Sequence, residues 1–595
     1  MTTYICKYSP VELLQAFGWE AVMPNEEVGD FAEADAWIHS SVCSHAKQLL
    51  SLLACPREDG ADQGESPSQA CGIGCKGRQC VVLTNCCDSI RRVFDTLRPE
   101  MEKRNTAFVM LDLPHNNSES SAEWYARQLM KLLDSFRPLW DRDRFLFLWH
   151  RTVQRWMEYK ERKNGFAQLA ILGARVGDQL KEKLESGFSM PMVDLTCGGC
   201  RTLSFFPEDA QTLTEEELLL EYARALLGQL PCTRMEDTGP RDALLSELES
   251  QGLKGIIYHT VRFCDYYSFE YTQIVNRLKV PVLKLESDYT IPGRGQLSTR
   301  LGAFAESLSD RNTSLTGQEK GRDTGGNMSG CLYYIGIDSG STTTNAAAVD
   351  GQGNILASRT VRTGARAADA AQGCLEEICD RIEEKTGKRP EASQFRVMAT
   401  GYGRSYLPFA NGQKTEISCH ALGARSLYAR VRTVIDIGGQ DSKVICLDEN
   451  GHVSNFVMND KCAAGTGRFL EMMAHTLQMD MDQLGSYGHK WNKDLTISSV
   501  CTVFAESEVV SLIAENHALD DIIHALNKAV ATKTASMVRR AGGEAPFMMT
   551  GGVARNKGLV KELERCLGEP LYIDDMPDMA GAIGAALFAK ELTEE

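Results

Sequence analysis

The sequence contains no apolar run near the roughly 18 consecutive residues that a membrane-spanning helix requires. It also has no excess of positive charge, because 64 Lys and Arg residues oppose 80 Asp and Glu residues and give a net charge of −16. This balance argues against nucleic acid or an anionic membrane as a main partner. The first residues, MTTYICKYSP, lack the basic region and apolar stretch of a secretory signal, so we expect a cytoplasmic protein.

No pattern repeats at a short fixed period, which argues against a solenoid. A chain of 595 residues is too long for one hydrophobic core, and the length suggests roughly four compact units. A content of 43% hydrophobic and 24% charged residues is typical of a globular protein. The twenty cysteines therefore indicate free thiols, cluster ligands or redox groups rather than a disulfide framework.

A polar, Gly-rich stretch from Ser309 to Gly330 is nearly free of large apolar residues, and we predict that it is a flexible linker. It separates a first half, residues 1–308, from a second half, residues 331–595, with twelve cysteines before it and eight after it. A second polar stretch, 56–79, is predicted to be a surface loop that interrupts the first half.

Both halves alternate short β-rich runs with amphipathic helical runs, which predicts an α/β fold with parallel sheets in two lobes of the first half. The predicted buried strands of that half are residues 80–85, 106–113, 254–260 and 280–286. After the linker, YYIGIDSGSTTTNAAAVD and RTVIDIGGQDSKVICLD each give a strand, an Asp, a Gly/Ser turn and a second strand. This repetition predicts an internally duplicated, two-lobed domain.

Asp338 and Asp436 each end an apolar strand and are followed by Gly within two residues. Small residues at such a turn let backbone N–H groups approach phosphate oxygens. The carboxylates are placed to hold a hydrated Mg²⁺ or to orient an attacking water. A third Gly-rich turn, 548–558, suits the adenosine end of a nucleotide. One such turn is weak evidence, but three in this order, with GAIGAALFA near the end, indicate a nucleotide site.

Cys462 in MNDKCAAGTGR and Cys501 in ISSVCTVFAESEV each precede a helix-like stretch of the same half. A 4Fe–4S cluster needs four thiolates, and this pair supplies two. The simplest closure is a twofold dimer in which each subunit gives two ligands. Both helix N-termini would then favour the thiolates of the cluster. The alternative is a pair of buried structural thiols.

Residues 333–590 resemble the activator ATPases of 2-hydroxyacyl-CoA dehydratases, which are related to benzoyl-CoA reductase ATPase subunits and belong to the acetate kinase–Hsp70–actin superfamily. The motifs GIDSGSTTT, ATGYGR, EISCHALGA, VIDIGGQDSK, NDKCAAGTGRF, SSVCTVFAESEV and TGGVARN match in order. The resemblance implies a two-lobed, actin-like (ribonuclease H-like) ATPase that binds ATP and Mg²⁺. It also implies a homodimer that shares an oxygen-sensitive 4Fe–4S cluster through Cys462 and Cys501.

The same resemblance assigns the nucleotide contacts. Those around the phosphates are Asp338, Ser339, Gly340, Ser341, Thr342, Asp436, Gly438, Gly439 and Gln440, and those facing the adenosine are Gly551, Gly552 and Asn556. Family members commonly have Lys where this chain has Asn345, so either a phosphate contact is missing or another base, such as Lys443, replaces it. A sugar kinase is the alternative for this half, but kinases of this fold do not need the 462/501 cysteine pair.

Cys43, the Cys86–Cys87 pair and Cys264 fall at strand ends or in loops, where α/β sites gather. With SPVELLQAFGWEAVMP and LKLESDYTIPGRGQLSTRLGAFAE, these segments resemble a 2-hydroxyacyl-CoA dehydratase subunit over about residues 1–308. The resemblance implies a 4Fe–4S cluster on Cys43, Cys87 and Cys264, with one iron open to the substrate carbonyl. The adjacent Cys86 is the alternative to Cys87.

Cys197 and Cys200 form a CxxC, which is a metal-ligand spacing. A fourth thiolate would close the open iron, or the extra ligands would support a second cubane. The latter occurs in double-cubane cluster proteins, which are dehydratase relatives that reduce small molecules. Cys71, Cys75 and Cys80 are further candidates in the loop region, for which we expect surface thiols.

Together the resemblances imply an anaerobic fusion of an ATP-dependent, electron-donating activase with its dehydratase-like acceptor. Ferredoxin or flavodoxin would supply an electron, and ATP would drive it onto the N-terminal cluster. In a dehydratase that electron makes a ketyl radical from an (R)-2-hydroxyacyl-CoA, which acidifies the β-hydrogen and expels hydroxide. Two alternatives stay open: a double-cubane reductase without CoA chemistry, and a first half that only docks the activator onto a separate dehydratase.

Overall fold

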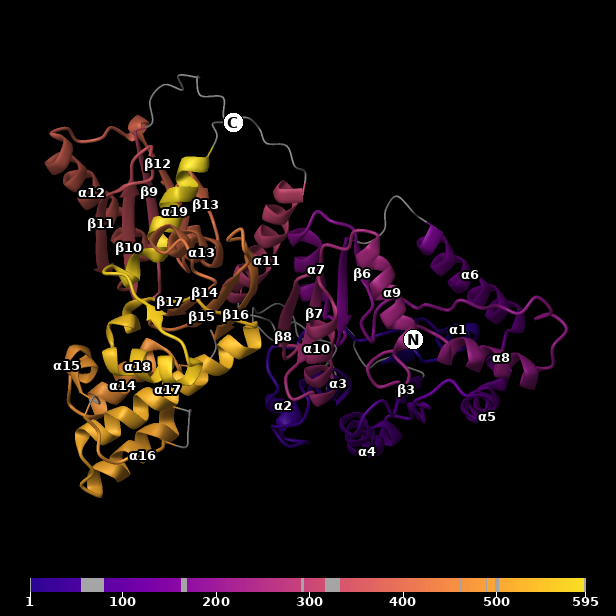
Figure 1. Cartoon of the computed structure of the whole chain (residues 1–595). Coiled ribbons are helices and arrows are strands. Elements are labelled where there is room, and N and C mark those ends of the chain that lie inside the picture. Colours follow the sequence, from indigo (N-terminus) through magenta and orange to yellow (C-terminus); the bar gives the residue numbers. More distant parts are fainter. Residues whose placement is uncertain are drawn as a thin grey trace, which may run out of the picture. The chain divides into compact units, whose positions relative to one another are not determined.

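The computed structural model describes residues 2–54, 80–161, 168–290, 294–315, 332–459, 463–487, 490–497 and 502–592. The chain divides into two compact units, Met1–Gly293 and Arg294–Glu595 (Figure 1). The predicted loop 56–79, Cys462 and Cys501 lie outside the described residues, as does most of the predicted linker. Among the helices that the structure describes, none is long and apolar enough to cross a membrane.

The first unit contains two four-stranded sheets in which neighbouring strands run parallel, which confirms the predicted pair of parallel-sheet lobes. The order β2-β1-β3-β4 makes the first sheet, with β1 Thr2–Tyr4, β2 Ala21–Val22, β3 Cys80–Thr84 and β4 Ala107–Leu111. The order β6-β5-β7-β8 makes the second sheet, with β5 Leu169–Gly173, β6 Met192–Asp194, β7 Gly255–Val261 and β8 Val282–Ser287.

Helices lie between these strands. They are α1 Val11–Ala16, α2 Ala32–Asp35, α3 Ser44–Ala54, α4 Asp88–Lys103, α5 Glu119–Ser135, α6 Arg142–Glu161, α7 Asp178–Gly187, α8 Glu215–Leu227, α9 Gly239–Ser250 and α10 Asp265–Arg277. The inner strands β3 and β7 are fully buried, whereas β4 and β8 are only partly buried. The prediction that all four are buried is therefore wrong for β4 and β8, because each is an edge strand with a neighbour on one side only.

The second unit contains two five-stranded mixed sheets of identical topology, which confirms the predicted internal duplication. The first has the order β11-β10-β9-β12-β13, with β9 Tyr333–Ser339, β10 Thr343–Val349, β11 Ile355–Arg362, β12 Phe395–Thr400 and β13 Gly412–Gln413. The second has the order β16-β15-β14-β17-β18, with β14 Thr433–Ile437, β15 Ser442–Leu447, β16 Val453–Asn459, β17 Phe547–Thr550 and β18 Leu571–Tyr572. In each, the first three strands pair antiparallel and the last two join parallel.

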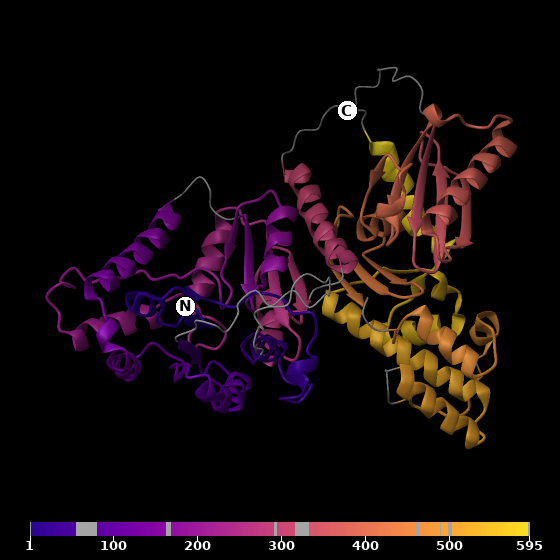
Figure 2. The same ribbon diagram turned by 180° about the vertical axis from the view of Figure 1, so that it is seen from behind.

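Helices pack against these two sheets and against one another (Figure 2). They are α12 Ala367–Thr386, α13 Glu416–Leu427, α14 Gly467–Thr476, α15 Met481–Ser486, α16 Thr502–Ala514, α17 Leu519–Ala541, α18 Lys557–Leu567 and α19 Ala580–Glu591. On β9, Ile335 and Ile337 pack with α12, while Gly336 between them lies against α19. This alternation follows from the twofold side-chain period of a strand and places α12 and α19 on opposite faces of the sheet.

Helix α11, Arg294–Leu315, belongs to the second unit although it precedes the predicted linker. Residues 309–315, which we expected to open the linker, continue this helix. Ala303 packs with Ile417, Ala421 and other apolar residues of the second unit. Apolar contacts such as those of Ala303 therefore explain why α11 packs with the second unit, and the polar composition of residues 309–315 did not predict this.

Candidate functional site

The two aspartates predicted to bind the nucleotide hold equivalent positions in the duplicated sheets. Asp338 of β9 pairs across its hairpin with Asn345 of β10, and Asp436 of β14 pairs with Lys443 of β15. All four residues are buried. Lys443 therefore stands in the second hairpin where Asn345 stands in the first. Its role as the base that replaces the missing family lysine stays a prediction.

His420 of α13 connects the two aspartates. Its Nε2 lies 3.6 Å from Asp338 Oδ2, and its Nδ1 lies 3.5 Å from Asp436 Oδ1. Sequence reasoning missed this residue, because a lone histidine in a helix has no spacing that points to a ligand. The sequence does contain one signal that could have pointed to His420. Glu416 lies four residues earlier, on the same face of the helix, so the two side chains form a polar pair.

A close crossing of α13 and α19 brings His420 to this place. A Cβ on Gly423 of α13 or on Gly584 of α19 would overlap the backbone of the other helix. A Cβ on Gly581, at the start of α19, would lie 2.3 Å from Asp338 Oδ2 and 2.8 Å from His420 Nε2. The small residues of the C-terminal GAIGAALFA motif thus bring α13 close to the Asp338 strand.

Lys443 is surrounded by three carboxylates. Its Nζ lies 2.9 Å from Asp441 Oδ2, 3.2 Å from Asp436 Oδ2 and 3.3 Å from Glu416 Oε2. Burial alone would lower the pKa of Lys443, but Glu416, Asp441 and Asp436 outweigh it and raise the pKa well above its usual range. Lys443 is therefore a fixed positive charge beside Asp436.

The two aspartates also act on His420. Burial would lower the pKa of His420, but the carboxylates of Asp436 and Asp338 outweigh burial and raise it to about 9. In turn, although burial opposes the shift, His420 and Lys443 lower the pKa of Asp436, helped by a hydrogen bond from Thr550 Oγ1 at 2.9 Å. At neutral pH the site therefore holds an ionised Asp436 and a protonated His420.

The Asp338 side of the site has unused hydrogen-bonding capacity. Among the described residues, Ser339 Oγ and Asn345 Oδ1 are buried without a partner. Asn345 and Thr400 are the residues that flank Asp338 on the neighbouring strands. Buried polar atoms are normally satisfied, so two open ones beside a carboxylate suit a polar ligand such as hydrated Mg²⁺ with phosphate.

The two predicted phosphate turns face each other. A Cβ on Gly439 would overlap Thr342 Oγ1, which brings the turn after β14 against the turn after β9. The carbonyls of Gly438 and Gly439 accept hydrogen bonds from the N–H groups of Gly467 and Arg468, at 2.8 and 2.7 Å. The first turn of α14 is thus attached to a phosphate turn. The other predicted contacts in these turns are Gly340, Ser341 and Gln440.

The predicted adenosine turn follows β17. Gly551 has φ +85°, and a Cβ there would overlap the carbonyl of Ile437, so the position requires glycine. Gly552 begins a short 3₁₀ turn. Asn556 caps α18 by accepting a hydrogen bond from Leu559 N–H, and its Nδ2 donates to Asn527. Contact of these residues with adenosine stays a prediction.

The charge of His420 predicts a pH dependence of stability in the metal- and nucleotide-free chain. The pKa is about 9 in the folded chain and about 6.5 when unfolded. The folded state therefore binds the extra proton, so this contribution is complete below about pH 6.5 and is lost as the pH rises through 9. We expect the thermal midpoint to fall more steeply from pH 7 to 10 in wild type than in His420→Asn. The thiols are present in both proteins, so their titration cannot cause a difference between them. If the thermal midpoints of the two proteins fall in parallel with pH, the raised pKa of His420 is contradicted.

In the first unit, three of the predicted thiol ligands lie together. Cys87 and Cys264 are the N-cap residues of α4 and α10, and Cys43 directly precedes α3. The thiols of Cys43 and Cys264 form a hydrogen bond, and Cys87 lies close enough to interact electrostatically with both. The alternative ligand Cys86 is hydrogen-bonded to Cys87. That these residues bind a cluster stays a prediction.

A second group of three thiols lies beside the first. Cys6 has two thiols as electrostatic neighbours. One is Cys232, and the other is Cys197 from the predicted CxxC. Sequence reasoning missed Cys6 and Cys232, because neither has a cysteine at metal-ligand spacing. Cys6 follows β1 and Cys197 follows β6, so both lie beyond the carboxyl ends of parallel strands. The topology, not local spacing, brings them together.

The other candidate cysteines of the first half are placed differently. Cys200 is exposed, and its charged neighbours are Asp194, Lys181 and Lys7. Cys80 was expected to be a surface thiol, but it is fully buried in β3 and packs in the core. Cys71 and Cys75 fall within the part of the chain that is not described.

No group of three or more His, Cys, Asp or Glu side chains in the described ranges converges as a site for a metal ion. A single ion gathers its thiolates within about 2.3 Å of one point. An iron–sulfur cluster instead holds each thiolate on a different iron, so its ligands are spread more widely. Thiols are the donor type that such a cluster uses.

Helix α11 holds the start of α13. Glu306 accepts hydrogen bonds from Thr415 Oγ1 at 2.6 Å, Ser418 Oγ at 2.5 Å and Thr415 N–H at 3.2 Å. Arg300 donates to the carbonyl of Met458, one residue before the end of β16. The helix that carries His420 is thus capped by a residue from before the predicted linker.

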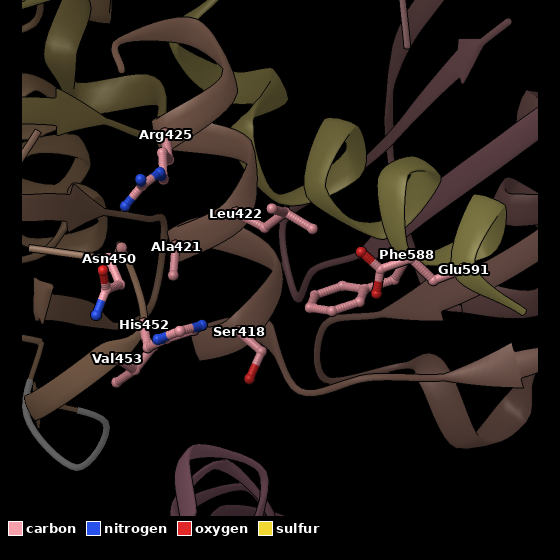
Figure 3. A pocket seen from close by; sticks show the side chains of 10 residues that line it. Ser418, Ala421, Leu422, Arg425, Asn450, His452, Val453, Phe588 and Glu591 are labelled. Carbon is pink, nitrogen blue, oxygen red and sulfur yellow. The ribbon is translucent and has the colours of Figure 1, made fainter. Parts of the chain in front are cut away.

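A cavity of about 450 Å³ lies on the other side of α13 (Figure 3). Ser418, Ala421, Leu422 and Arg425 line it from the helix, together with residues of the β15–β16 turn and the end of α19. At 100° per residue these positions lie on the face of α13 opposite His420. The cavity is therefore separate from the nucleotide residues.

Family models match the two halves separately. Residues 335–589 match the BadF/BadG/BcrA/BcrD ATPase family. Residues 6–143 and 154–308 match the 2-hydroxyglutaryl-CoA dehydratase D-component. These matches confirm both resemblances predicted from the motifs.

Individual relatives cover the second half. The 2-hydroxyisocaproyl-CoA dehydratase activator of Clostridioides difficile is 41% identical over 264 residues, 44% of this chain and 97% of that protein. The (R)-2-hydroxyglutaryl-CoA dehydratase activating ATPase of Acidaminococcus fermentans is 42% identical over 43% of this chain and 97% of its own length. The activator of lactoyl-CoA dehydratase of Anaerotignum propionicum is 40% identical over 44% of this chain and 100% of its own length.

Among solved structures, the activator of the 2-hydroxyisocaproyl-CoA dehydratase from Clostridium difficile with bound ADPNP is 42% identical to this chain. It covers 44% of this chain and 95% of its own, with a TM-score of 0.41.

Proposed function

The chain belongs to the BadF/BadG/BcrA/BcrD ATPase family and carries a dehydratase-like half in front of that ATPase, and on this basis we propose an ATP-driven electron transferase. In this proposal the second half hydrolyses ATP as an activase. Each hydrolysis gates the passage of a low-potential electron from a cluster held by Cys462 and Cys501 of two subunits to the thiol site of the first half. Ferredoxin or flavodoxin is the proposed donor.

The connection between the phosphate turn and α14 carries this proposal. Gly467 and Arg468, which bond the carbonyls of Gly438 and Gly439, follow Cys462 by five and six residues. A change in the turn on loss of the terminal phosphate would therefore move α14 and the segment that carries Cys462. Coupling of this kind needs a two-state element that both sites bias, and α14 is the candidate.

The intervening segment is held at several points. Ser442 Oγ donates to the carbonyl of Gly465 at 3.0 Å, directly beside Lys443 in the nucleotide site. Asn459 and Lys533 both donate to the carbonyl of Ala464, at 3.0 and 2.5 Å. These contacts attach Ala464 and Gly465, two and three residues after Cys462 in the sequence, to their surroundings, which favours transmission of a small movement.

In the proposed ATP site, Asp338, Asp436 and His420 have different roles. Asp338, beside open polar atoms, is the proposed ligand of hydrated Mg²⁺ and phosphate. Asp436, kept ionised by His420 and Lys443, would orient the attacking water. His420 keeps a proton on both ring nitrogens and fixes the two carboxylates relative to each other.

In the first half, Cys43, Cys87 and Cys264 would hold the acceptor cluster at three helix starts. A cluster with three thiolates leaves one iron open, which suits the carbonyl of an (R)-2-hydroxyacyl-CoA. The proposed reaction is therefore the radical dehydration of such a thioester. A separate dehydratase is the alternative acceptor if the first half only docks the activator.

The second thiol group favours one further candidate. Cys6, Cys197 and Cys232 supply three more ligands next to the first three. Six ligands suit two linked cubanes, and the chain would then be an ATP-dependent reductase of a small molecule without CoA chemistry. Iron content separates the two candidates.

The test is a count of iron and acid-labile sulfide in the anaerobically purified chain. We expect about six irons per chain if the first half holds one cubane, and about ten for a double cubane, each including half of a shared cluster. Cys462→Ser or Cys501→Ser should remove about two irons per chain and loosen the dimer.

The matched control is Cys566→Ser, which changes a half-buried thiol of α18 and should leave iron content and dimer intact. Full iron content in both Cys462→Ser and Cys501→Ser would exclude the shared cluster. If a Cys462→Ser chain retains no iron at all, the first half holds no cluster, and docking of the activator onto a separate dehydratase becomes its proposed function.

A further inference from the structure

Among the residues of the first unit that the structure describes, three cations near the thiols have no carboxylate paired with them. Lys7 is 2% exposed and Arg175 is 3% exposed. Arg234 is partly exposed, but its Nε is buried without a hydrogen-bond partner. In the described part of the chain, none of the three forms an ion pair.

Other buried or largely buried arginines of the same unit are paired. Arg201 lies 2.6 Å from Glu12, and Arg241 lies 2.6 Å from Glu270. Removing a charge from water is costly unless an opposite charge accompanies it. The three unpaired cations therefore indicate that an anion belongs beside them.

Arg234 faces the first thiol group. Its Nη1 donates to Tyr267 Oη at 3.1 Å, and its guanidinium lies 5.2 Å from the ring centre of Tyr266 and 5.3 Å from that of Tyr267. Its electrostatic neighbours include the thiols of Cys86, Cys87 and Cys197. The side chain is thus held in place by two aromatic rings with its charge directed among cysteines.

Lys7 lies beside the second thiol group: it follows Cys6 directly, and its backbone N–H donates to the carbonyl of Cys197 at 3.4 Å. Burial lowers the pKa of Lys7, and the thiols of Cys232, Cys6 and Cys197 act in the opposite direction. Arg175 supports the turn that carries Cys197. A Cβ on Gly198 would lie 2.5 Å from Arg175 Cγ, so the arginine stem runs directly beneath the turn. Its Nε and Nη1 have no partner among the residues described.

We propose that Lys7 and Arg234 are the counter-charges of the N-terminal iron–sulfur site and set its reduction potential. This inference rests on the proposed function, since it assumes that the thiols hold an anionic cluster. A cluster becomes more negative when it accepts an electron, and nearby positive charge stabilises that state. The two cations would therefore make the acceptor easier to reduce.

The experiment is an EPR-monitored redox titration of the full chain carrying Cys462→Ser and Cys501→Ser, so that the N-terminal signal stands alone. Arg234→Met should make reduction about tenfold less favourable, which for one electron is a shift of about 59 mV to more negative potential. Lys7→Met should shift the potential in the same direction. Arg234→Lys keeps the charge and should stay near the parent value.

Arg104→Met is the matched control, because it removes an equal charge at the far end of α4, roughly 25 Å from Cys87 by helical rise. It should leave the potential unchanged. Loss of iron in Arg234→Met but not in Arg234→Lys would support the counter-charge. Potentials of Arg234→Met and Lys7→Met equal to that of Arg104→Met would overturn it. A parent chain without N-terminal iron would instead refute the proposed function.

Discussion

An Asp436→Asn chain should hydrolyse ATP about two to three orders of magnitude more slowly than wild type. Asparagine keeps the shape of the side chain but removes the charge on which His420, Lys443 and Thr550 converge. An amide can neither orient a water as a base does nor balance the two cations beside it. Phosphate release at saturating MgATP measures the effect, and a thermal melt shows whether the variant is folded.

Asp441→Asn is the control for Asp436→Asn. Asp441 also pairs with Lys443, at 2.9 Å, but its side chain is 28% exposed and lies outside the contact with His420. We expect its hydrolysis rate to fall less than tenfold. Asp338→Asn should be as slow as Asp436→Asn. Near-normal turnover in both would mean that ATP is hydrolysed elsewhere.

The second large effect concerns the direction of electron flow. With a low-potential donor, the N-terminal cluster should become reduced when MgATP is present and stay oxidised when it is absent. The reason is that α14 connects the phosphate turn to the Cys462 segment, so the donor cluster would reach its transferring state only in the nucleotide cycle. Stopped-flow absorbance or freeze-quench EPR would follow the reduction.

The Asp436→Asn chain is the internal control for this gating, because it retains all the proposed cluster ligands. It should bind iron normally and yet fail to reduce the N-terminal cluster on addition of MgATP. Equal reduction with and without nucleotide in wild type would show that ATP does not gate the transfer.

The sequence was sufficient to predict the duplicated sheets and the position of both aspartates. Each Asp lies at the end of an apolar strand followed by a small-residue turn, and this pattern is local. His420 was missed because its function depends on the crossing of α13 and α19, two helices that are far apart in the sequence. Helix crossings depend on packing and leave no spacing rule along the chain.

The thiols of the first unit show the same limit. Cys43, Cys87 and Cys264 were predicted because the segments around them resemble a dehydratase subunit, and each falls in a strand-end or loop setting. Cys6 follows β1 and Cys232 follows α8, and the two become neighbours only in the folded chain. Cys80 was assigned to a polar loop by its neighbours in sequence, but it is the first residue of a buried strand.

The position of α11 limits where the gene could be divided into two. The ATPase family model begins at residue 335, whereas the dehydratase model runs to residue 308. A split between those points would give the ATPase product no Glu306, and Thr415 and Ser418 would lose their acceptor at the start of the helix that bears His420. The separate second half would therefore lack these hydrogen bonds unless the division came before Arg294. The sequence matched by the dehydratase model thus includes part of a helix that belongs to the ATPase unit, so the two matched regions cannot be exchanged independently.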